Sequence, residues 1–73
     1  MTQDEAEKSI KEVFPNKLML NKKEVVQITG RSMSALDRDI SDGTGVSYKK
    51  VRGRVLYPIT EVARWMIDLI ETN

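Results

Sequence analysis

Basic residues are concentrated in one short stretch of the sequence. Lys49, Lys50, Arg52 and Arg54 lie within six positions, with Gly53 between the two arginines. Cations spaced this closely can neutralise several phosphates of a nucleic-acid backbone at once, and the glycine lets the chain approach that backbone. The same charges could instead protect an exposed β-edge from pairing with another chain. We favour phosphate contact, because four cations exceed what edge protection requires.

The net charge of the whole chain, +1, conceals a strong asymmetry along it. Residues 1–16 and residues 59–73 each sum to −2, whereas residues 17–58 sum to +5. A basic centre between acidic ends is typical of a protein that binds a polyanion. Outside the cluster, the candidate contacts to a phosphate backbone are Lys22, Lys23 and Arg31.

The side chains that most often carry catalysis are missing, because the sequence has no cysteine and no histidine. The acidic residues are spread over expected helix surfaces without a paired-carboxylate motif. Residues 42–45 precede an expected hairpin and not a helix, so their glycines do not form a phosphate-binding loop. We therefore expect no enzymatic activity, no metal ion and no cofactor.

Length and hydropathy favour one small domain that is not in a membrane. The 73 residues suffice for one modest core without disulfide bonds. No apolar run approaches the roughly 18–20 residues that a membrane span requires, and the acidic start of the chain is unlike a secretory signal. We expect a cytoplasmic protein.

Capping signals and apolar periodicity predict four helices and a hairpin. Thr2 with Glu5, and Asn21 with Glu24, have the spacing of capping boxes. Gly30 can end the second helix in the left-handed conformation. The expected helices cover residues 2–14, 21–29, 32–41 and 59–71, and the hairpin covers residues 46–57.

The hairpin and the aromatic residues leave some alternatives open. A strict two-residue turn at Arg52-Gly53 would pair Val51 with Arg54 and Tyr48 with Tyr57, but the imperfect alternation does not decide the register. Single-strand stacking on aromatic rings is a possible function. We instead assign Trp65 to the core, because it lies in the apolar stripe of the last helix, and the tyrosines to the junction of the hairpin with the body.

The third expected helix has two distinct faces. On a helical wheel, Met33, Leu36 and Ile40 form the stripe expected to be buried. The residues expected to face outward are Ser34, Ala35 and Arg38. Arg38 could pair with Asp42 on the next turn. We favour contact with DNA, because Arg38 points directly away from the apolar stripe.

The order of these elements is that of a helix-turn-helix followed by a wing. The motifs Leu20-Asn21-Lys22-Lys23-Glu24-Val25-Val26, Thr29-Gly30-Arg31-Ser32, Leu36-Asp37-Arg38, Val51-Arg52-Gly53-Arg54-Val55-Leu56-Tyr57 and Glu61-Val62-Ala63-Arg64-Trp65-Met66 resemble the MerR-like excisionase family. The resemblance covers roughly residues 18–68. It implies a mainly α fold with a small β-hairpin: an acidic N-terminal helix in residues 1–16, added to a winged helix-turn-helix in residues 17–73.

The function that the resemblance implies is binding to double-stranded DNA. Such proteins are excisionase-like recombination directionality factors or small transcriptional regulators of phages and mobile elements, in the cytoplasm of a bacterium or a phage-infected host cell. The implied partners are DNA, an integrase or recombinase, and further copies along the DNA. By position, Ser32 and Ser34 would begin the recognition helix, Arg38 would meet a phosphate or a base, and Arg52 and Arg54 would belong to the wing.

Two features depart from the family's pattern. Asp37 and Asp39 place negative charge near the expected groove contact, and the loop at residues 42–46 lacks the proline that the family often has there. These departures leave the docking angle and the entry to the wing open.

Two other functions also stay open. One is the DNA-recognition domain of a phage small terminase.

The other is a protein-interaction adaptor or anti-repressor whose acidic N-terminal helix engages a partner. That helix carries a sparse apolar stripe of Ala6, Ile10, Val13 and Phe14. The stripe could mediate self-association or pack within the chain.

Overall fold

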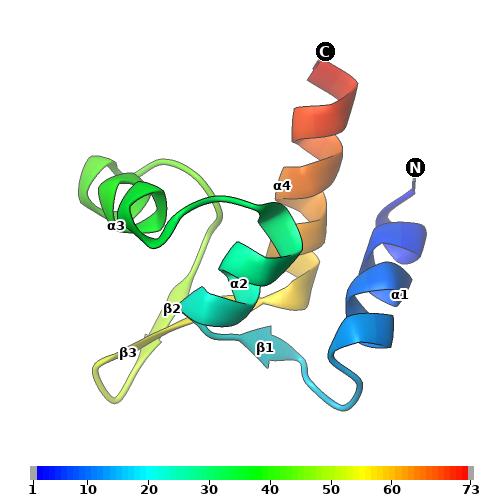
Figure 1. Cartoon of the computed structure of the whole chain (residues 1–73), viewed down its shortest axis with the longest axis horizontal. Coiled ribbons are helices and arrows are strands. Elements are labelled where there is room, and N and C mark those ends of the chain that lie inside the picture. The colour runs from blue at the N-terminus through cyan, green and yellow to red at the C-terminus, as the bar shows by residue number, and fades with distance from the viewer. Residues whose placement is uncertain (1, 73) are drawn as a thin grey trace.

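The computed structural model describes residues 2–72, with side chains described through residue 70. This part of the chain is mainly helical, with four α-helices and a small antiparallel sheet of three strands (Figure 1). None of the helices described has the length and apolar character that crossing a bilayer requires. The elements in chain order are α1 (Gln3–Val13), β1 (Met19–Leu20), α2 (Lys22–Thr29), α3 (Met33–Asp42), β2 (Lys49–Val51), β3 (Arg54–Pro58) and α4 (Ile59–Thr72).

The first two helices begin at the expected capping boxes. In α1 the backbone N–H of Glu5 donates to the Thr2 hydroxyl at 3.2 Å, and the Thr2 N–H donates back to the Glu5 carboxylate at 3.1 Å. Asn21 and Glu24 make the same reciprocal pair at the start of α2, at 2.8 and 2.9 Å. Each box satisfies two backbone donors that a helix start otherwise leaves unpaired.

Two tight connections bring α2, α3 and the hairpin together. Gly30 ends α2 with a φ of 77°, and Ser32 caps α3 by accepting from the Ala35 N–H at 3.1 Å. The β2–β3 turn has positive φ at both central residues, 51° at Arg52 and 79° at Gly53. Positive φ at both positions defines the type I′ turn, whose twist matches that of the strands it joins.

The hairpin has the strict two-residue register, with Val51 opposite Arg54 and Lys49 opposite Leu56. Beyond the paired residues, the Tyr48 and Tyr57 rings lie 6.2 Å apart between centroids. The strand β1 was not expected from the sequence. It pairs with β3 through Leu20 opposite Tyr57 and places β3 at the centre of the sheet. Two residues are too few to show a strand period, so β1 exists because its partner strand is near.

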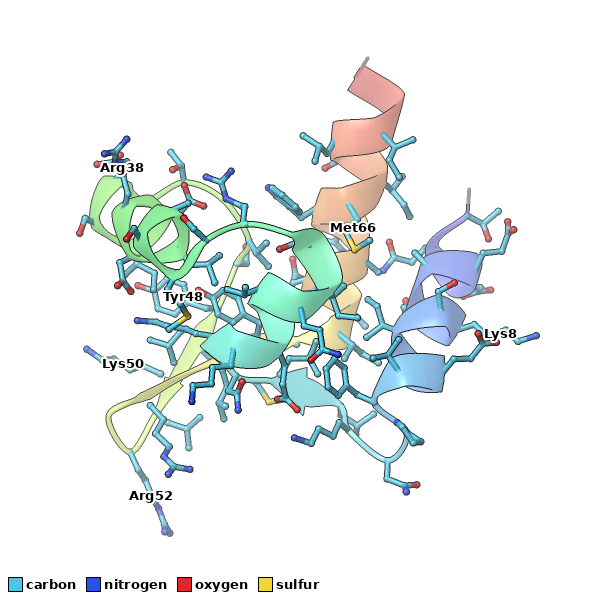
Figure 2. All side chains as sticks on the ribbon, in the orientation of Figure 1. Lys8, Arg38, Tyr48, Lys50, Arg52 and Met66 are labelled. Carbon is cyan, nitrogen blue, oxygen red and sulfur yellow. The ribbon has the colours of Figure 1, made fainter. Side chains whose placement is uncertain are left out.

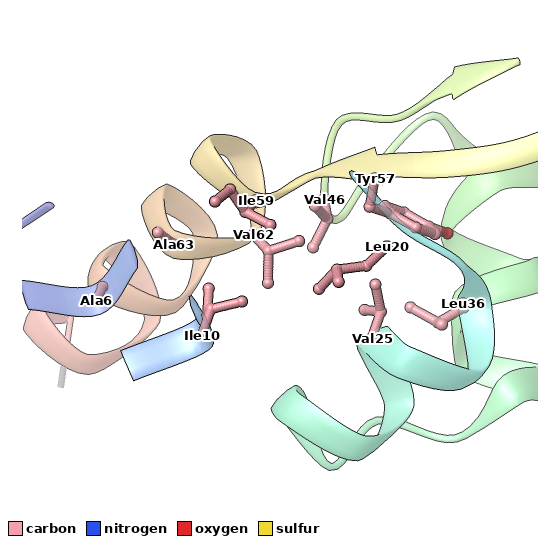
Figure 3. Close-up of a cluster of buried hydrophobic side chains, with 10 residues drawn as sticks. All are labelled: Ala6, Ile10, Leu20, Val25, Leu36, Val46, Tyr57, Ile59, Val62 and Ala63. Carbon is pink, nitrogen blue, oxygen red and sulfur yellow. The ribbon is translucent and has the colours of Figure 1, made fainter. Parts of the chain in front are cut away.

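The hydrophobic core joins the N-terminal helix to the rest of the chain. Ala6 and Ile10 of α1, each 2% exposed, belong to the same buried cluster as Val62 and Ala63 of α4 (Figure 3). The stripe on α1 therefore packs within the chain, which was one of its two expected roles, although Val13 stays exposed. Trp65 is half-buried against the cluster, in agreement with its assignment to the core.

The buried face of α3 differs from the expected one. Leu36 is buried and Ile40 is half-buried, but Met33 is 42% exposed and Asp39 is only 8% exposed. The buried stripe is thus rotated by about 40° toward Asp39, at 100° per residue. Burial of the Asp39 carboxylate is tolerated because the Arg31 guanidinium donates two hydrogen bonds to it.

Candidate nucleic-acid interface

The hairpin presents the cationic cluster to solvent. Every residue of β2 and of the turn is exposed, as is Arg54 at the start of β3. Opposite residues of an antiparallel pair share a face, so Lys50 lies on the same face of the hairpin as Val55 and the buried Tyr57. Lys49 and Arg54 lie on the other face. The cluster therefore surrounds the hairpin and does not line one side of it.

Helix α3 adds a cation to the same edge of the molecule. Arg38 is exposed, and among the side chains described it makes no ion pair, so the alternative pair with Asp42 does not form. Figure 2 shows Arg38, Lys50 and Arg52 along one edge, whereas Lys8 of α1 points away on the opposite side. The molecule is flat, with extents of 31, 30 and 17 Å, and this edge spans most of one long dimension.

The other candidates on α3 differ in what they can offer a ligand. Ser34 is exposed, whereas Ala35 is half-buried. The Ser32 oxygen already accepts a backbone N–H as the helix cap, so its hydroxyl proton is what it can donate to a phosphate or a base. Arg38 is the residue of this helix with both charge and reach.

Two of the three candidate backbone contacts outside the cluster are held in ion pairs. Lys22 of α2 pairs with Asp37 of α3 at 2.5 Å. Arg31 pairs with Asp39 through both carboxylate oxygens, at 2.9 and 2.8 Å. Lys23 is exposed and unpaired among the described side chains. Both aspartates that departed from the family pattern are therefore neutralised within the chain.

In a third ion pair, the charges of Lys17 and Glu24 offset each other. The Lys17 ammonium contacts the Glu24 carboxylate directly. Burial acts to raise the pKa of Glu24, but the hydrogen bonds from Lys17 and from the Asn21 N–H outweigh burial and hold this pKa below its ordinary value. Because Lys17, Lys22 and Arg31 are each paired with a nearby acid, the excess positive charge of the central segment is left on Lys23, Arg38 and the hairpin.

An open groove of about 620 Å³ extends from the start of α2 to the turn of the hairpin. Its walls include Lys23 and Arg54 beside Met19 and Leu56. No signal in the sequence predicts this groove, because its two walls are about 30 residues apart along the chain and meet in the fold, where β1 pairs with β3 and α2 packs against β3. The groove places Lys23 within the same basic region as the hairpin.

The part of the chain described brings together no group of three or more side chains suited to hold a metal ion. No family model, curated protein or solved structure matches the chain.

Proposed function

We propose that the protein binds double-stranded DNA as a winged helix-turn-helix, with α3 as the recognition helix and the β2–β3 hairpin as the wing. The observation that carries this proposal is the gathering, on one edge, of cations from α3 and the hairpin that have no ion pair among the described side chains, while Asp37 and Asp39 of the same region are each paired within the chain. Arg38 meets the base edges or phosphates of the major groove, and the hairpin follows the adjacent backbone.

The dimensions of the elements support this assignment. Ten residues make α3 about 15 Å long, and a major groove about 12 Å wide admits a helix. The two long extents of the molecule, 31 and 30 Å, are close to one helical turn of B-DNA, about 34 Å. A single copy can therefore contact the major groove and a neighbouring phosphate strand together.

In the role that we propose, the protein is an excisionase-like recombination factor or a small transcriptional regulator. The acidic helix α1 lies on the side away from the basic edge (Figure 1). DNA binding would leave that side open to a recombinase or to another copy on the same DNA. A protein-interaction adaptor without DNA binding is the competing function, and salt dependence separates the two.

The first experiment measures binding to a labelled mixed-sequence duplex by fluorescence anisotropy at several salt concentrations. Contact with about five phosphates predicts a slope of log K against log salt of about −4.5, or a loss of affinity of several hundredfold between about 50 and 200 mM salt. A single strand of equal length serves as comparison and should bind more weakly. No duplex binding at low salt would contradict the proposal and favour the adaptor.

The matched pair of variants is Arg38→Met and Lys8→Met. Both remove one exposed cation from a helix surface, but only Arg38 lies on the proposed edge. We expect Arg38→Met to weaken binding about tenfold and to reduce the steepness of the salt slope by about one unit. Lys8→Met should bind like the unmodified protein. Equal effects of the two substitutions would contradict the role of Arg38.

A further inference from the structure

Arg31 occupies a position at which three elements meet. It follows the turn glycine at the end of α2, and its guanidinium donates Nε–H to one Asp39 oxygen at 2.9 Å and Nη2–H to the other at 2.8 Å. The guanidinium carbon also lies 5.8 Å from the ring centroid of Trp65 on α4. A guanidinium that donates two hydrogen bonds to a carboxylate and also lies over an aromatic ring is restricted from two sides.

Asp39 is held from its other side by the loop that follows α3. The Thr44 N–H donates to the Asp39 carbonyl oxygen at 2.8 Å. A Cβ atom at Gly45 would lie 2.6 Å from Asp39 Oδ2, so the loop backbone is pressed against the carboxylate. The side chain of Asp39 is only 12% exposed, and that of Arg31 is 37% exposed. The contacts among Arg31, Asp39, Gly45 and Trp65 form a unit that we call the latch.

The latch matters because the other supports of α3 come from few residues. Among the elements, α3 packs chiefly against α2, through the buried Leu36 and the Lys22–Asp37 ion pair, and its expected apolar anchor Met33 is exposed. The latch ties the middle of α3 to the preceding turn, to the loop leading into the hairpin and to α4. The orientation of α3 relative to the hairpin, on which simultaneous DNA contact depends, is therefore set partly by an ion pair.

Two uses of Arg31 compete. Three of its five N–H donors remain beyond the two that Asp39 accepts, but the carboxylate already offsets the charge of the guanidinium. To place an uncompensated charge on a phosphate, Arg31 would have to leave Asp39, and a nearly buried carboxylate would then lack its partner, which is strongly unfavourable. We propose that Arg31 is a positioning residue: with Asp39 and Trp65 it orients α3 for DNA and makes no phosphate contact itself. This inference rests on the proposed DNA binding for its consequence, but the latch can also be tested without DNA.

The two uses predict opposite effects of Asp39→Asn. If Arg31 were a phosphate contact, loss of the aspartate charge would free it and duplex affinity would rise. For a positioning pair, Asp39→Asn should lower affinity about tenfold although it removes a negative charge near the DNA. Arg31→Met should lower affinity by a similar factor with an unchanged salt slope, whereas a lost phosphate contact would reduce the steepness by about one unit.

A double replacement tests whether the charges act only through position. Buried ion pairs can often be replaced by apolar pairs of similar volume without loss of stability. Arg31→Met/Asp39→Leu should therefore recover affinity to within about threefold of the unmodified protein, with the same salt slope. Failure of the double variant to recover would overturn the inference, provided that its circular dichroism shows a folded chain.

The readout without DNA is the fluorescence of Trp65, the only tryptophan in the sequence. Arg31→Met and Asp39→Asn should each change its emission, because the first removes the guanidinium from the ring and the second weakens the pair that holds it there, whereas Arg38→Met should not. In a double-mutant cycle of unfolding, the two latch substitutions should be coupled by at least fivefold in the equilibrium constant. Additive effects would overturn the latch.

The two proposals can therefore fail separately. If the unmodified protein shows no duplex binding, the proposed function fails while the emission and coupling results still judge the latch. If the unmodified protein binds and Asp39→Asn binds more tightly, the latch fails and Arg31 returns to the set of phosphate contacts. Should Asp39→Asn not fold, Arg31→Lys replaces it: the retained charge without bidentate geometry should still lower affinity.

Discussion

Arg31 and Arg38 are both arginines of the basic central segment, yet the structure gives them opposite surroundings. Arg38 projects from α3 without an ion pair among the described side chains, and Arg31 is clamped between Asp39 and Trp65. Residue type and spacing placed both among the candidates for DNA contact. What distinguishes them is the Asp39 carboxylate, which lies eight positions beyond Arg31 along the chain and pairs with it. No periodicity in the sequence predicts that pairing.

Arg52 combines a charge with a backbone conformation that residues other than glycine, asparagine and aspartate rarely adopt. Its φ of 51° in the type I′ turn is a strained choice that asparagine tolerates better. We predict that Arg52→Asn stabilises the protein by up to about 1 kcal/mol and at the same time weakens duplex binding through the lost charge. Urea unfolding and anisotropy measure the two effects.

The matched control for this prediction is Arg54→Asn, which removes a charge next to the turn but outside its positive-φ positions. It should weaken binding without stabilising the chain. Stabilisation by both substitutions, or by neither, would contradict the conformational explanation.

At the scale of elements, the start of α2 depends on the ionised Glu24. Because the folded state holds the pKa of Glu24 below its ordinary value of 4.5, this group contributes stability at pH values above 4.5. The contribution is lost as the pH falls through the lowered pKa, when protonation weakens the bonds from Lys17 and Asn21. We predict that Glu24→Gln loses less stability than the unmodified protein between neutral pH and pH values well below 4.5.

Urea unfolding at a series of pH values measures this difference. Glu12→Gln on α1 provides the control, because Glu12 is exposed and takes part in no ion pair among the described residues. An acid profile for Glu24→Gln that parallels that of the unmodified protein would show that the capping box does not carry the pH dependence.

The hairpin and α2 also show that short-range signals can leave the relation between elements undecided. The Arg52-Gly53 turn and the Asn21 cap were both expected, and both are confirmed. The groove between these two elements depends on β1, whose two residues pair with β3 far along the chain. A two-residue strand has no period of its own, so only the folded chain reveals it.

For the whole molecule, α1 completes the core by packing on α4. Ile10 is 2% exposed, and we predict that Ile10→Ala lowers the free energy of unfolding by about 2–5 kcal/mol, a large part of the about 5–15 kcal/mol typical of small domains. Val13→Ala on the same helix is the control: with 48% of Val13 exposed, its change should stay within about 0.5 kcal/mol.

Thermal or urea unfolding measures both variants. Under conditions in which the Ile10→Ala protein is fully folded, its DNA binding should be unchanged. Equal, small changes for the two substitutions would mean that α1 is not part of the cooperative core. That result would favour the alternative role of α1, in which its apolar stripe binds a partner or another copy of the chain.

The sequence by itself determined the local structure of this protein and the place of its positive charge. Helix caps, turn glycines and the Arg52-Gly53 turn act through groups within about four residues of one another, so the sequence alone suffices to locate them. The tertiary structure decided which charges are free, which helix face is buried and where α1 packs. Those outcomes depend on contacts between distant residues, such as Lys22 with Asp37 and Leu20 with Tyr57. A charge held in such a contact is no longer available to a ligand, and only the folded chain reveals which charges these are.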